Sequence, residues 1–398
     1  MTDPLGQSQV IPYLAGLQKA GYQITILSCE KEAAYNLKKD SIKSLLHESG
    51  LQWYPLMYTK KPPVLSTLWD VIKLRRAAAA IHKKNKVAMV HTRPGIPSMV
   101  GYWFKKKYGA FFLNDIREFY ADSRVDGGMW NLDSPLYKRI YNYFKAGEAK
   151  QVAQSDGIVC LTYAAKKIIK SWPEYKPDIP LQVIPCSVDT NLFNAGNISS
   201  AEKERTAQKL GIAPDTQLFT YLGSIGGWYL TDEMMRLCKI IADKIPSSKF
   251  LFISPHEHET IAAAAQRQGL PSNRLITTHA NRNEIPLLLS LSDYSIFFIK
   301  PCYSKQSSSP TKHGELMAMG IPVITNSGVG DVAEIVEKYN DGYVLTDFND
   351  KAYEEIADNI SARPSFDRER IREGALEFYS LNEAVKKYIS IYQSILKS

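Results

Sequence analysis

Residues 307–325 read Ser-Ser-Ser-Pro-Thr-Lys-His-Gly-Glu-Leu-Met-Ala-Met-Gly-Ile-Pro-Val-Ile-Thr, and this stretch says most about the fold. Ser309 is a preferred N-cap residue and Pro310 suits the first helical position, so we expect a helix to begin here. Gly320 is expected to end that helix, before a strand over residues 322–325. A helix placed between two buried strands indicates a parallel sheet covered by helices.

The beginning of this expected helix combines three features that suit a nucleotide. A helix N-terminus offers backbone N–H groups and the positive end of the helix dipole to phosphate oxygens. Lys312 adds a full positive charge in the first turn, and Glu315, three residues on, shares its face. We expect Glu315 to accept hydrogen bonds from two ribose hydroxyls while Lys312 faces a diphosphate. The alternative is a capped surface helix in which Lys312 and Glu315 only pair with each other.

Apolar, β-branched runs alternate with amphipathic stretches along nearly the whole chain. Such alternation predicts parallel sheets with helices on both faces, and two series of strands predict two doubly wound α/β domains. Their boundary is expected near residues 187–196, where a strand ends and the polar stretch 194–205 begins. Because ligands bind outside the carboxyl ends of parallel strands, we expect the site in the cleft between the domains. The expected strands are residues 24–27, 87–91, 110–113, 157–161 and 182–184, then 218–222, 249–253, 274–277, 294–299, 322–325 and 342–344, and the expected helices include residues 10–20, 68–83, 136–154 and 231–244.

The composition is that of a globular protein with two domains. Hydrophobic residues make up 44% of the 398 residues and charged residues 23%, which excludes a disordered or fibrous chain. Neither a signal peptide nor a membrane-spanning stretch is visible. The five cysteines are widely spaced and form no Cys-x-x-Cys pair. We therefore expect no disulfide framework, no zinc site and a reducing, cytoplasmic location.

The positive charge is concentrated in the first half of the chain. Residues 1–190 carry 27 Lys and Arg against 16 Asp and Glu, whereas the remainder carries 22 against 25. A basic half can attract anionic lipid headgroups, a phosphate-bearing acceptor or nucleic acid, and the alternative is an ordinary solvated surface. No compact nucleic-acid motif accompanies the charge, so we expect no nucleic-acid partner. We expect instead that the first domain contacts the inner face of an anionic membrane peripherally.

The segment from Glu315 to Ile324 resembles the nucleotide-binding region of retaining glycosyltransferases with the GT-B fold, specifically glycosyltransferase family 4. The resemblance implies that Glu315 binds the donor ribose. It also implies that Ser309, Thr311 and Lys312, at the beginning of the helix, bind the donor phosphates. The family places a second glutamate eight positions earlier, where this chain has Ser307. A serine there still offers a hydrogen bond to the donor sugar, but no charge.

A second resemblance covers Tyr221-Leu-Gly-Ser-Ile-Gly-Gly-Trp-Tyr-Leu-Thr-Asp-Glu-Met234, which matches the first strand, glycine loop and helix of the family's donor domain. Small residues let a backbone approach a pyrophosphate closely. Many family members place an Arg and a Lys in this loop, at positions that match Ser224 and Tyr229 here. The missing charge is therefore expected from Lys312, Lys300 or Arg117. The donor-binding glycines implied by this match are Gly223, Gly226 and Gly227.

The first half of the chain also resembles this family. The opening Asp3-Pro-Leu-Gly-Gln-Ser-Gln resembles the glycine loop of the acceptor domain, which implies that Gly6 and Gln7 lie beside the donor. His91, Asp115 and Arg117 follow expected strands, where a doubly wound domain presents its functional groups. The last two belong to an Asp-x-Arg pattern in this branch of the family. We expect a catalytic role for His91 from its place at a strand end, and the alternative is a structural histidine. The resemblance implies catalytic roles for Asp115, Arg117 and Lys312.

The amino-terminal end departs from the family pattern. In related enzymes a buried strand precedes the first glycine loop, whereas only Met1 and Thr2 precede Asp3 here. We expect the first sheet to lack its usual first strand, with a gap among its central strands. Residues 2–8 are then expected to be loosely held.

Taken along the whole chain, the resemblance implies a fold, a division into domains and a reaction. The implied parts are an acceptor-side domain over residues 1–190, a nucleotide-sugar domain over residues 191–375 and a final segment, residues 376–398, whose helix packs back on the first domain. The implied reaction is transfer of a sugar, with retention, from a nucleoside-diphosphate sugar to a saccharide or lipid-linked acceptor in bacterial surface polysaccharide synthesis. The nucleotide sugar is a substrate, and no metal or further cofactor is expected. Two alternatives are a nucleotide-sugar 2-epimerase or hydrolase of the same fold, and a non-catalytic partner that binds nucleotide sugars.

Overall fold

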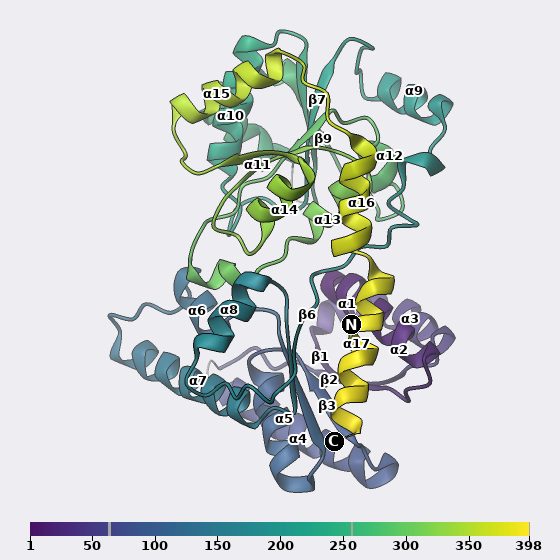
Figure 1. The fold of residues 1–398 in the computed structure, drawn as a ribbon, viewed down its shortest axis with the longest axis vertical. Coiled ribbons are helices and arrows are strands. Elements are labelled where there is room, and N and C mark those ends of the chain that lie inside the picture. Colours follow the sequence, from purple (N-terminus) through teal and green to yellow (C-terminus); the bar gives the residue numbers. More distant parts are fainter. Residues whose placement is uncertain (63–64, 256–257, 398) are drawn as a thin grey trace. The chain divides into compact units, whose positions relative to one another are not determined.

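The computed structural model describes residues 1–62, 65–255 and 258–397, and the chain forms two compact α/β units. Unit 1 contains residues 1–187 together with the C-terminal helix from Leu381 onward, and unit 2 contains residues 188–380 (Figure 1). Residue 398, the last of the predicted final segment, lies outside the described residues. Each unit is considered by itself below.

Unit 2 is built on a six-stranded parallel sheet with the strand order β9-β8-β7-β10-β11-β12. This is the doubly wound order, in which the order of strand addition reverses between the parallel strands β7 and β10. Ligands bind at the carboxyl ends of the two strands at that switch point. The strands are β7 (Gln217–Leu222), β8 (Ser248–Ile253), β9 (Leu275–Thr278), β10 (Tyr294–Ile296), β11 (Val323–Asn326) and β12 (Gly342–Leu345).

The strands of unit 2 form because they are short, nearly continuous apolar runs. Five of the six residues of β7 are buried, as expected for a strand covered by helices on both faces. In the core the ring of Phe219 stacks on those of Phe250 and Tyr294, with centroids 5.4 and 5.5 Å apart. The helices are α9 (Ser200–Lys209), α10 (Thr231–Lys244), α11 (His258–Arg267), α12 (Ile285–Leu289), α13 (Thr311–Ala318), α14 (Val332–Tyr339), α15 (Asp350–Ser361) and α16 (Arg368–Phe378).

Unit 1 contains two parallel sheets, β1-β2 and β3-β4-β5-β6. Among the described residues, β1 and β3 each pair with a single strand, so unit 1 has two sheet edges that an uninterrupted doubly wound sheet would lack. All four residues of β3 are partly exposed, unlike those of the buried strand β5. The strands are β1 (Thr25–Glu30), β2 (Gln52–Met57), β3 (Met89–Thr92), β4 (Phe111–Ile116), β5 (Gly157–Cys160) and β6 (Leu181–Val183).

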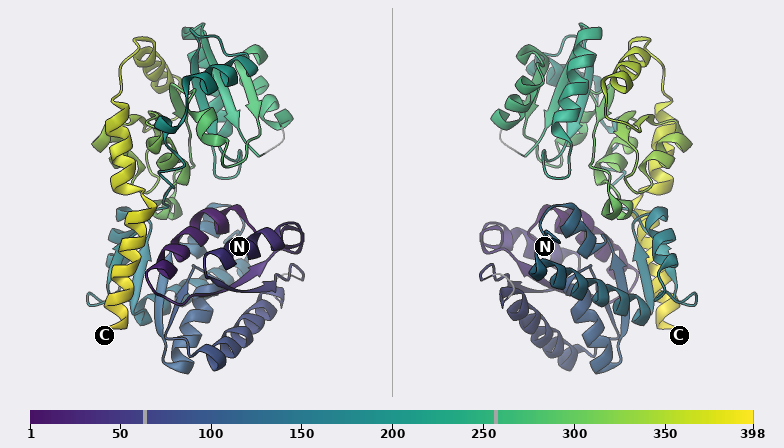
Figure 2. Two further views of the ribbon diagram at one scale, coloured as in Figure 1. Left: turned by 90° about the vertical axis from the view of Figure 1, so that its right-hand side faces the viewer. Right: turned by 90° about the vertical axis from the view of Figure 1, so that its left-hand side faces the viewer.

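The helices of unit 1 surround these strands, and the last of them comes from the C-terminal end of the chain. Helix α17 packs against α2 (Figure 2). Its buried Tyr388 and Ile391 join the core around Leu113 and Val159. The prediction of a final helix that packs on the first domain is therefore confirmed. The helices of unit 1 are α1 (Pro4–Gln9), α2 (Ile11–Lys19), α3 (Glu32–Glu48), α4 (Leu65–Asn85), α5 (Ile96–Tyr108), α6 (Tyr120–Asp126), α7 (Pro135–Gln154), α8 (Tyr163–Ser171) and α17 (Leu381–Leu396).

The first residues of the chain differ from expectation. Pro4–Gln9 form a short helix rather than a glycine loop, with Pro4 at the helix start, where its missing N–H costs nothing. Thr2 is buried and is held by Glu30, which accepts hydrogen bonds from its backbone N–H at 2.9 Å and from its hydroxyl at 2.5 Å. The expectation that this segment is loosely held is therefore wrong for Thr2. No helix in the part of the chain that the structure describes is both long and apolar enough to cross a bilayer.

Candidate functional site

The predicted nucleotide-binding helix is α13. It begins at Thr311, two residues after the predicted N-cap Ser309, because Pro310 keeps an extended backbone (ψ 115°) and takes the N-cap position itself. Gly320 follows the helix with φ +68°, a left-handed conformation that glycine adopts without strain. All residues from Lys312 to Ala318 are buried. The helix is therefore an interior element of unit 2, and not a capped surface helix.

Lys312 lies in an aromatic box at the beginning of α13. Its Nζ donates a hydrogen bond to the hydroxyl of Tyr221 at 3.2 Å and lies 4.3 and 3.8 Å from the ring centres of Tyr221 and Tyr229. Burial lowers the pKa of Lys312 to about 7, although the charge of Glu315 acts in the opposite direction. The electron-rich faces of the two rings favour the charged form of the amine. The residue is thus poised to gain or lose a proton near neutral pH.

The glycine loop after β7 lies directly beside this ammonium group. A Cβ built on Gly223 would lie 3.1 Å from the Lys312 Nζ, a tight contact, and the φ of +119° at this position favours glycine. The Tyr221 hydroxyl, which accepts from Lys312, donates to the backbone carbonyl of Ser224. Tyr221 therefore connects the amine on α13 to the loop, which also contains Gly226 and Gly227, both with positive φ.

The glycine loop is fixed to the neighbouring strand at the switch point of the sheet. The backbone N–H of Leu230 donates to the carbonyl of Phe298 at 3.1 Å, and that of Lys300 donates to the carbonyl of Trp228 at 2.9 Å. The loop and the segment after β10 are therefore held side by side, where a doubly wound sheet binds its ligand. In the sequence, Tyr229 differs from a family pattern, and no feature there predicts a role for Tyr221.

Glu315 lies one helical turn after Lys312 and is also buried. Its Oε1 accepts a hydrogen bond from Nη1 of Arg282 at 2.9 Å. Burial raises the pKa of Glu315, and the positive charges of Arg282 and Lys312 oppose that rise. Arg282 comes from the segment between β9 and α12, and no sequence feature pointed to it. Arg282 and Tyr221 are the functional candidates described above that sequence reasoning missed in unit 2.

The three remaining donor-site candidates of unit 2 lie around the beginning of α13. Ser307 is fully buried at the end of a short 3₁₀ helix, and its hydroxyl donates to the carbonyl of Ser304 at 2.7 Å. Ser309 and Thr311 are partly exposed on either side of Pro310. The structure thus collects the predicted residues of unit 2 around one helix N-terminus and one glycine loop. Gly6 and Gln7 belong to unit 1, in helix α1, where Gln7 donates to the carbonyl of Thr2 at 3.3 Å.

The predicted catalytic residues of unit 1 lie together at the carboxyl ends of β3 and β4. Oδ2 of Asp115 lies 3.2 Å from Nε2 of His91 and accepts from Nε of Arg117 at 3.1 Å. Asp115 is fully buried, which by itself raises its pKa. The charges of Arg117 and Arg93 and the hydrogen bond from His91 outweigh this effect and hold the pKa well below its ordinary value.

Two tyrosines from α17 complete this cluster, and sequence analysis did not identify either of them. The hydroxyl of Tyr388 donates to Oδ2 of Asp115 at 2.8 Å and accepts from Nη2 of Arg117 at 2.9 Å. The hydroxyl of Tyr392 lies 2.9 Å from Nδ1 of His91. The cluster therefore also ties the C-terminal helix to the strand ends of unit 1. Among His91, Asp115 and Arg117, His91 is the most accessible, with 17% of its side chain exposed. Arg93, whose Nε lies 3.8 Å from Oδ2 of Asp115, is 35% exposed.

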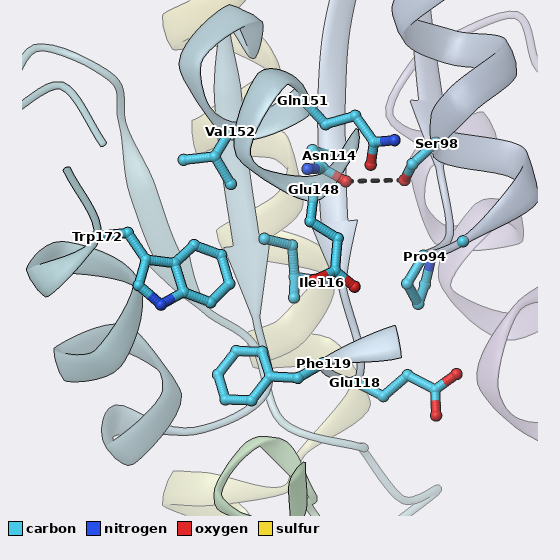
Figure 3. Close-up of a pocket in the computed structure, with 11 residues that line it drawn as sticks. Pro94, Ser98, Asn114, Ile116, Glu118, Phe119, Glu148, Gln151, Val152 and Trp172 are labelled. Carbon is cyan, nitrogen blue, oxygen red and sulfur yellow. Dashed lines mark hydrogen bonds between the residues drawn. The ribbon is translucent and has the colours of Figure 1, made fainter. Parts of the chain in front are cut away.

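A small pocket also lies in unit 1, where Asn114 and Ile116 line it from β4, on either side of Asp115 in the sequence. Figure 3 shows the rings of Trp172 and Phe119 on one side and the polar groups of Asn114, Ser98 and Gln151 on the other. The Ser98 hydroxyl donates to Oδ1 of Asn114 at 2.9 Å. No residue predicted from the sequence lines the pocket. Its remaining lining residues are Pro94, Gly95, Ile116, Glu118, Glu148 and Val152.

The fold agrees with comparisons to known proteins. A glycosyltransferase from Rickettsia africae ESF-5 superposes with a TM-score of 0.73 at 18% identity, over 99% of this chain and 97% of that chain. Sucrose-phosphate synthase from Thermosynechococcus elongatus gives 0.70 at 14% identity, over 97% and 92% of the two chains. HepE from Anabaena, determined with UDP and glucose, gives 0.69 at 14% identity, over 98% of each chain. A search of curated protein sequences found no significant match.

These similarities show that the fold is GT-B. The chain has two α/β units, each built on parallel strands, and its C-terminal helix α17 contacts the N-terminal helix α2. Residues 202–377 match the family described as "Glycosyl transferases group 1". Residues 202–377 therefore form a glycosyltransferase group 1 domain, of glycosyltransferase family 4, and the solved structures with a similar fold include GT-B glycosyltransferases.

Proposed function

We propose that this protein transfers a hexose from a UDP-sugar to a saccharide or lipid-linked acceptor, on the cytoplasmic side of a bacterial membrane, in the synthesis of a surface polysaccharide. The observation that carries the donor assignment is the position of Lys312, buried at the N-terminus of α13 and directly beside Gly223 of the glycine loop. The solved structure of HepE with UDP and glucose supports uridine as the base.

In the proposed donor complex the diphosphate lies between the glycine loop and the N-terminus of α13. Backbone N–H groups and the Lys312 ammonium contact its oxygens, and Glu315 accepts a hydrogen bond from the ribose. The Arg282 contact occupies Oε1 of Glu315 and fixes the orientation of the carboxylate. Ser307, Ser309 and Thr311 lie close enough to the helix start to contribute hydroxyl groups to the phosphates or the sugar.

The proposed reaction breaks the bond between the anomeric carbon and the phosphate oxygen. The departing UDP gains negative charge, which Lys312 and the dipole of α13 stabilise more strongly in the transition state than in the bound donor. The acceptor hydroxyl oxygen forms the new bond to the anomeric carbon, and its proton passes to the departing phosphate. Retention then follows when attack and departure occur on the same face of the sugar.

The proposed contribution of unit 1 is the cluster of His91, Asp115 and Arg117. Asp115 fixes both the imidazole and the guanidinium group, so neither needs to reorganise when charge develops nearby. Because His91 is the most exposed of these three residues, we propose it as the group that meets the substrate, with Asp115 and Arg117 as positioning residues.

The acceptor is proposed to bind unit 1. The pocket beside β4 combines aromatic rings, carboxylates and amides, the groups with which proteins stack on sugar rings and bind their hydroxyls. The excess of positive charge in residues 1–190 supports an anionic acceptor or membrane surface. Exchange of Glu118 for Gln is expected to slow transfer to the acceptor while leaving slow hydrolysis of the donor unchanged.

A nucleotide panel followed by product analysis tests the proposal. UDP and UDP-sugars are expected to raise the melting temperature more than other nucleotides, because they bind only the folded protein. Lys312→Met should abolish that rise, whereas Lys351→Met, an exposed lysine on α15, should not. Release of a free sugar or an epimer without an acceptor would favour the epimerase alternative. Binding without turnover across many acceptors would favour a non-catalytic partner.

A further inference from the structure

Helix α4 of unit 1 presents an apolar stripe to solvent. Leu65, Leu68, Trp69 and Ile72 are 62%, 56%, 50% and 40% exposed. Their spacing (i, i+3, i+4, i+7) places them on one face of the helix. The opposite face of α4 is also apolar and is buried, with Val71 and Leu74 packed against Val100 of α5. The exposed stripe is therefore additional to what the helix needs for folding.

The segment that follows β2 extends this surface. Met57 and Tyr58 are 38% and 51% exposed. Lys73 of α4 holds them in place, because its ammonium donates to the carbonyl of Met57 at 2.5 Å and to the hydroxyl of Thr59 at 2.9 Å. Asp70 accepts from the backbone N–H of Thr59 at 3.0 Å. We define the α4 face as Met57, Tyr58, Leu65, Leu68, Trp69 and Ile72.

The charge around the α4 face has a single sign. Residues 57–108 contain twelve Lys and Arg and one acidic residue, Asp70, which is buried and paired with Lys73 at 2.7 Å. Outside this stretch, residues 1–190 carry 15 Lys and Arg against 15 Asp and Glu. The whole positive excess of the first half of the chain therefore belongs to the segment that contains the α4 face. Lys60 and Lys61 precede the stripe, and Arg76 continues it one turn beyond Ile72; all three are exposed.

We infer that the α4 face inserts into the headgroup region of an anionic bilayer and so anchors unit 1 at the membrane surface. A helix with exposed Leu, Ile and Trp side chains, flanked by Lys and Arg, binds such an interface through apolar burial and attraction to acidic lipids. Trp and Tyr favour the same depth. This inference rests on the proposed membrane-linked acceptor and names the surface that would reach it.

Charge favours lipid over a second copy of the chain as the occupant. Two copies paired through identical α4 faces would bring two sets of like charges together, with no exposed acidic residue from residues 57–108 to compensate. An anionic lipid surface complements both features of the face. Burial of the apolar stripe then accompanies neutralisation of Lys60, Lys61 and Arg76.

Vesicle co-sedimentation of the full chain tests the inference. Vesicles of phosphatidylcholine with about one third phosphatidylglycerol should bind the protein, binding should weaken with added salt, and phosphatidylcholine alone should bind it at least about tenfold more weakly. The double variant Leu68→Ser/Ile72→Ser should lose about tenfold or more in binding to the acidic vesicles. Leu376→Ser, which removes a 42% exposed leucine from α16 of unit 2, is the matched control and should bind normally.

Other outcomes overturn the inference. Equal vesicle binding by the double variant and the control would show that the apolar stripe does not insert. A wild-type dimer that forms without lipid and dissociates in the double variant would show that the face binds a second copy. Stabilisation by UDP is measured on the same variants. If it is retained while vesicle binding fails in every variant, the membrane inference fails and the proposed donor site stands. If UDP stabilises neither the wild type nor the variants, the proposed function fails first.

Discussion

The Lys312 ammonium nitrogen lies 3.8 Å from the centre of the Tyr229 ring. Tyr229 matches a position at which the sequence resemblance leads one to expect a lysine in the glycine loop. The Tyr229 ring therefore contacts the Lys312 ammonium of α13, whereas a lysine at position 229 would itself place a positive charge in the loop. Because the site is buried, the Lys312 ammonium carries a desolvation cost that a loop lysine in solvent would avoid.

Binding of UDP is expected to depend on pH through Lys312. Its pKa is about 7 in the free protein, so above pH 7 the amine is mostly neutral and must take up a proton to meet a diphosphate. Affinity should therefore fall as pH rises above 7, by up to about tenfold per unit. Isothermal titration at pH 8 in buffers of different ionisation enthalpy should reveal proton uptake. Lys312→Arg, which stays charged, should show none; uptake that persists in this variant would assign the proton to another group.

Folding stability should respond to the same group. An unfolded lysine keeps its proton up to about pH 10.4, whereas folded Lys312 loses it near pH 7, so stability should rise with pH between these values. Below pH 7 the full cost of burying the charge is present. Lys312→Met should therefore raise the free energy of unfolding at pH 6, on the order of a few kcal/mol, while abolishing transfer. Urea unfolding of the wild type and Lys312→Met at pH 6 and pH 9 measures the change in stability, and an equal change at the two pH values would contradict the assignment.

The aromatic box can be tested with a matched pair of variants at Tyr229. Tyr229→Phe keeps the ring face and should leave the pH midpoint of UDP binding unchanged. Tyr229→Leu removes a cation–π contact of about 1–2 kcal/mol, so the ammonium form is less stable and the midpoint should move to lower pH. Both variants remain apolar and similar in bulk, which separates the electrostatic effect from packing. An identical midpoint in all three proteins would show that the ring only fills space.

The residues of the donor helix could be predicted from the sequence because their signals are local. Lys312 and Glu315 lie in one short stretch, with an expected strand after it, and the apolar runs of unit 2 read directly as buried strands. Strand β2 was not predicted, because its residues are only partly buried and include Pro55, which a strand tolerates at an edge. The beginning of α13 was predicted too early, because Ser309 by its residue type suits an N-cap. In the structure Pro310 takes the N-cap position.

The partners of the predicted residues could not be found in the same way. Tyr221 lies 91 residues from Lys312, and Tyr388 lies 273 residues from Asp115. Only the folded chain brings such pairs together, and a tyrosine in an apolar strand or helix reads as core in any sequence. The charge of Asp115 was visible in the sequence, but its burial against α17 was not.

The Glu315–Arg282 pair should contribute to nucleotide binding as a unit. Glu315→Ala should weaken UDP binding by about 1.5–3 kcal/mol, the scale of hydrogen bonds to a charged group. Arg282→Ala leaves the carboxylate buried without its 2.9 Å partner, so its pKa should rise further and binding should weaken less than in Glu315→Ala. The double variant should then bind about as well as Glu315→Ala alone, because Arg282 acts through Glu315. Additive losses would mean that Arg282 contacts the nucleotide directly.

The buried cluster of unit 1 can act in the reaction or only in folding, and variants of Asp115 and Tyr388 distinguish the two roles. The pKa of Asp115 is held well below its ordinary value, so its charged form stabilises the folded protein above about pH 4, and this contribution is lost as the pH falls. Asp115→Asn should lower the free energy of unfolding at pH 7 by about 3–5 kcal/mol, since Arg117 would be left buried without its counter-charge. Tyr388→Phe removes one hydrogen bond, should cost about 1 kcal/mol, and leaves the charge pair intact.

Transfer assays below the melting temperature of both variants then decide the role. If Asp115 positions His91 for the reaction, kcat should fall strongly in Asp115→Asn with KM for the UDP-sugar unchanged, and only slightly in Tyr388→Phe. A normal kcat in folded Asp115→Asn would leave the cluster with one task, the attachment of α17 to unit 1.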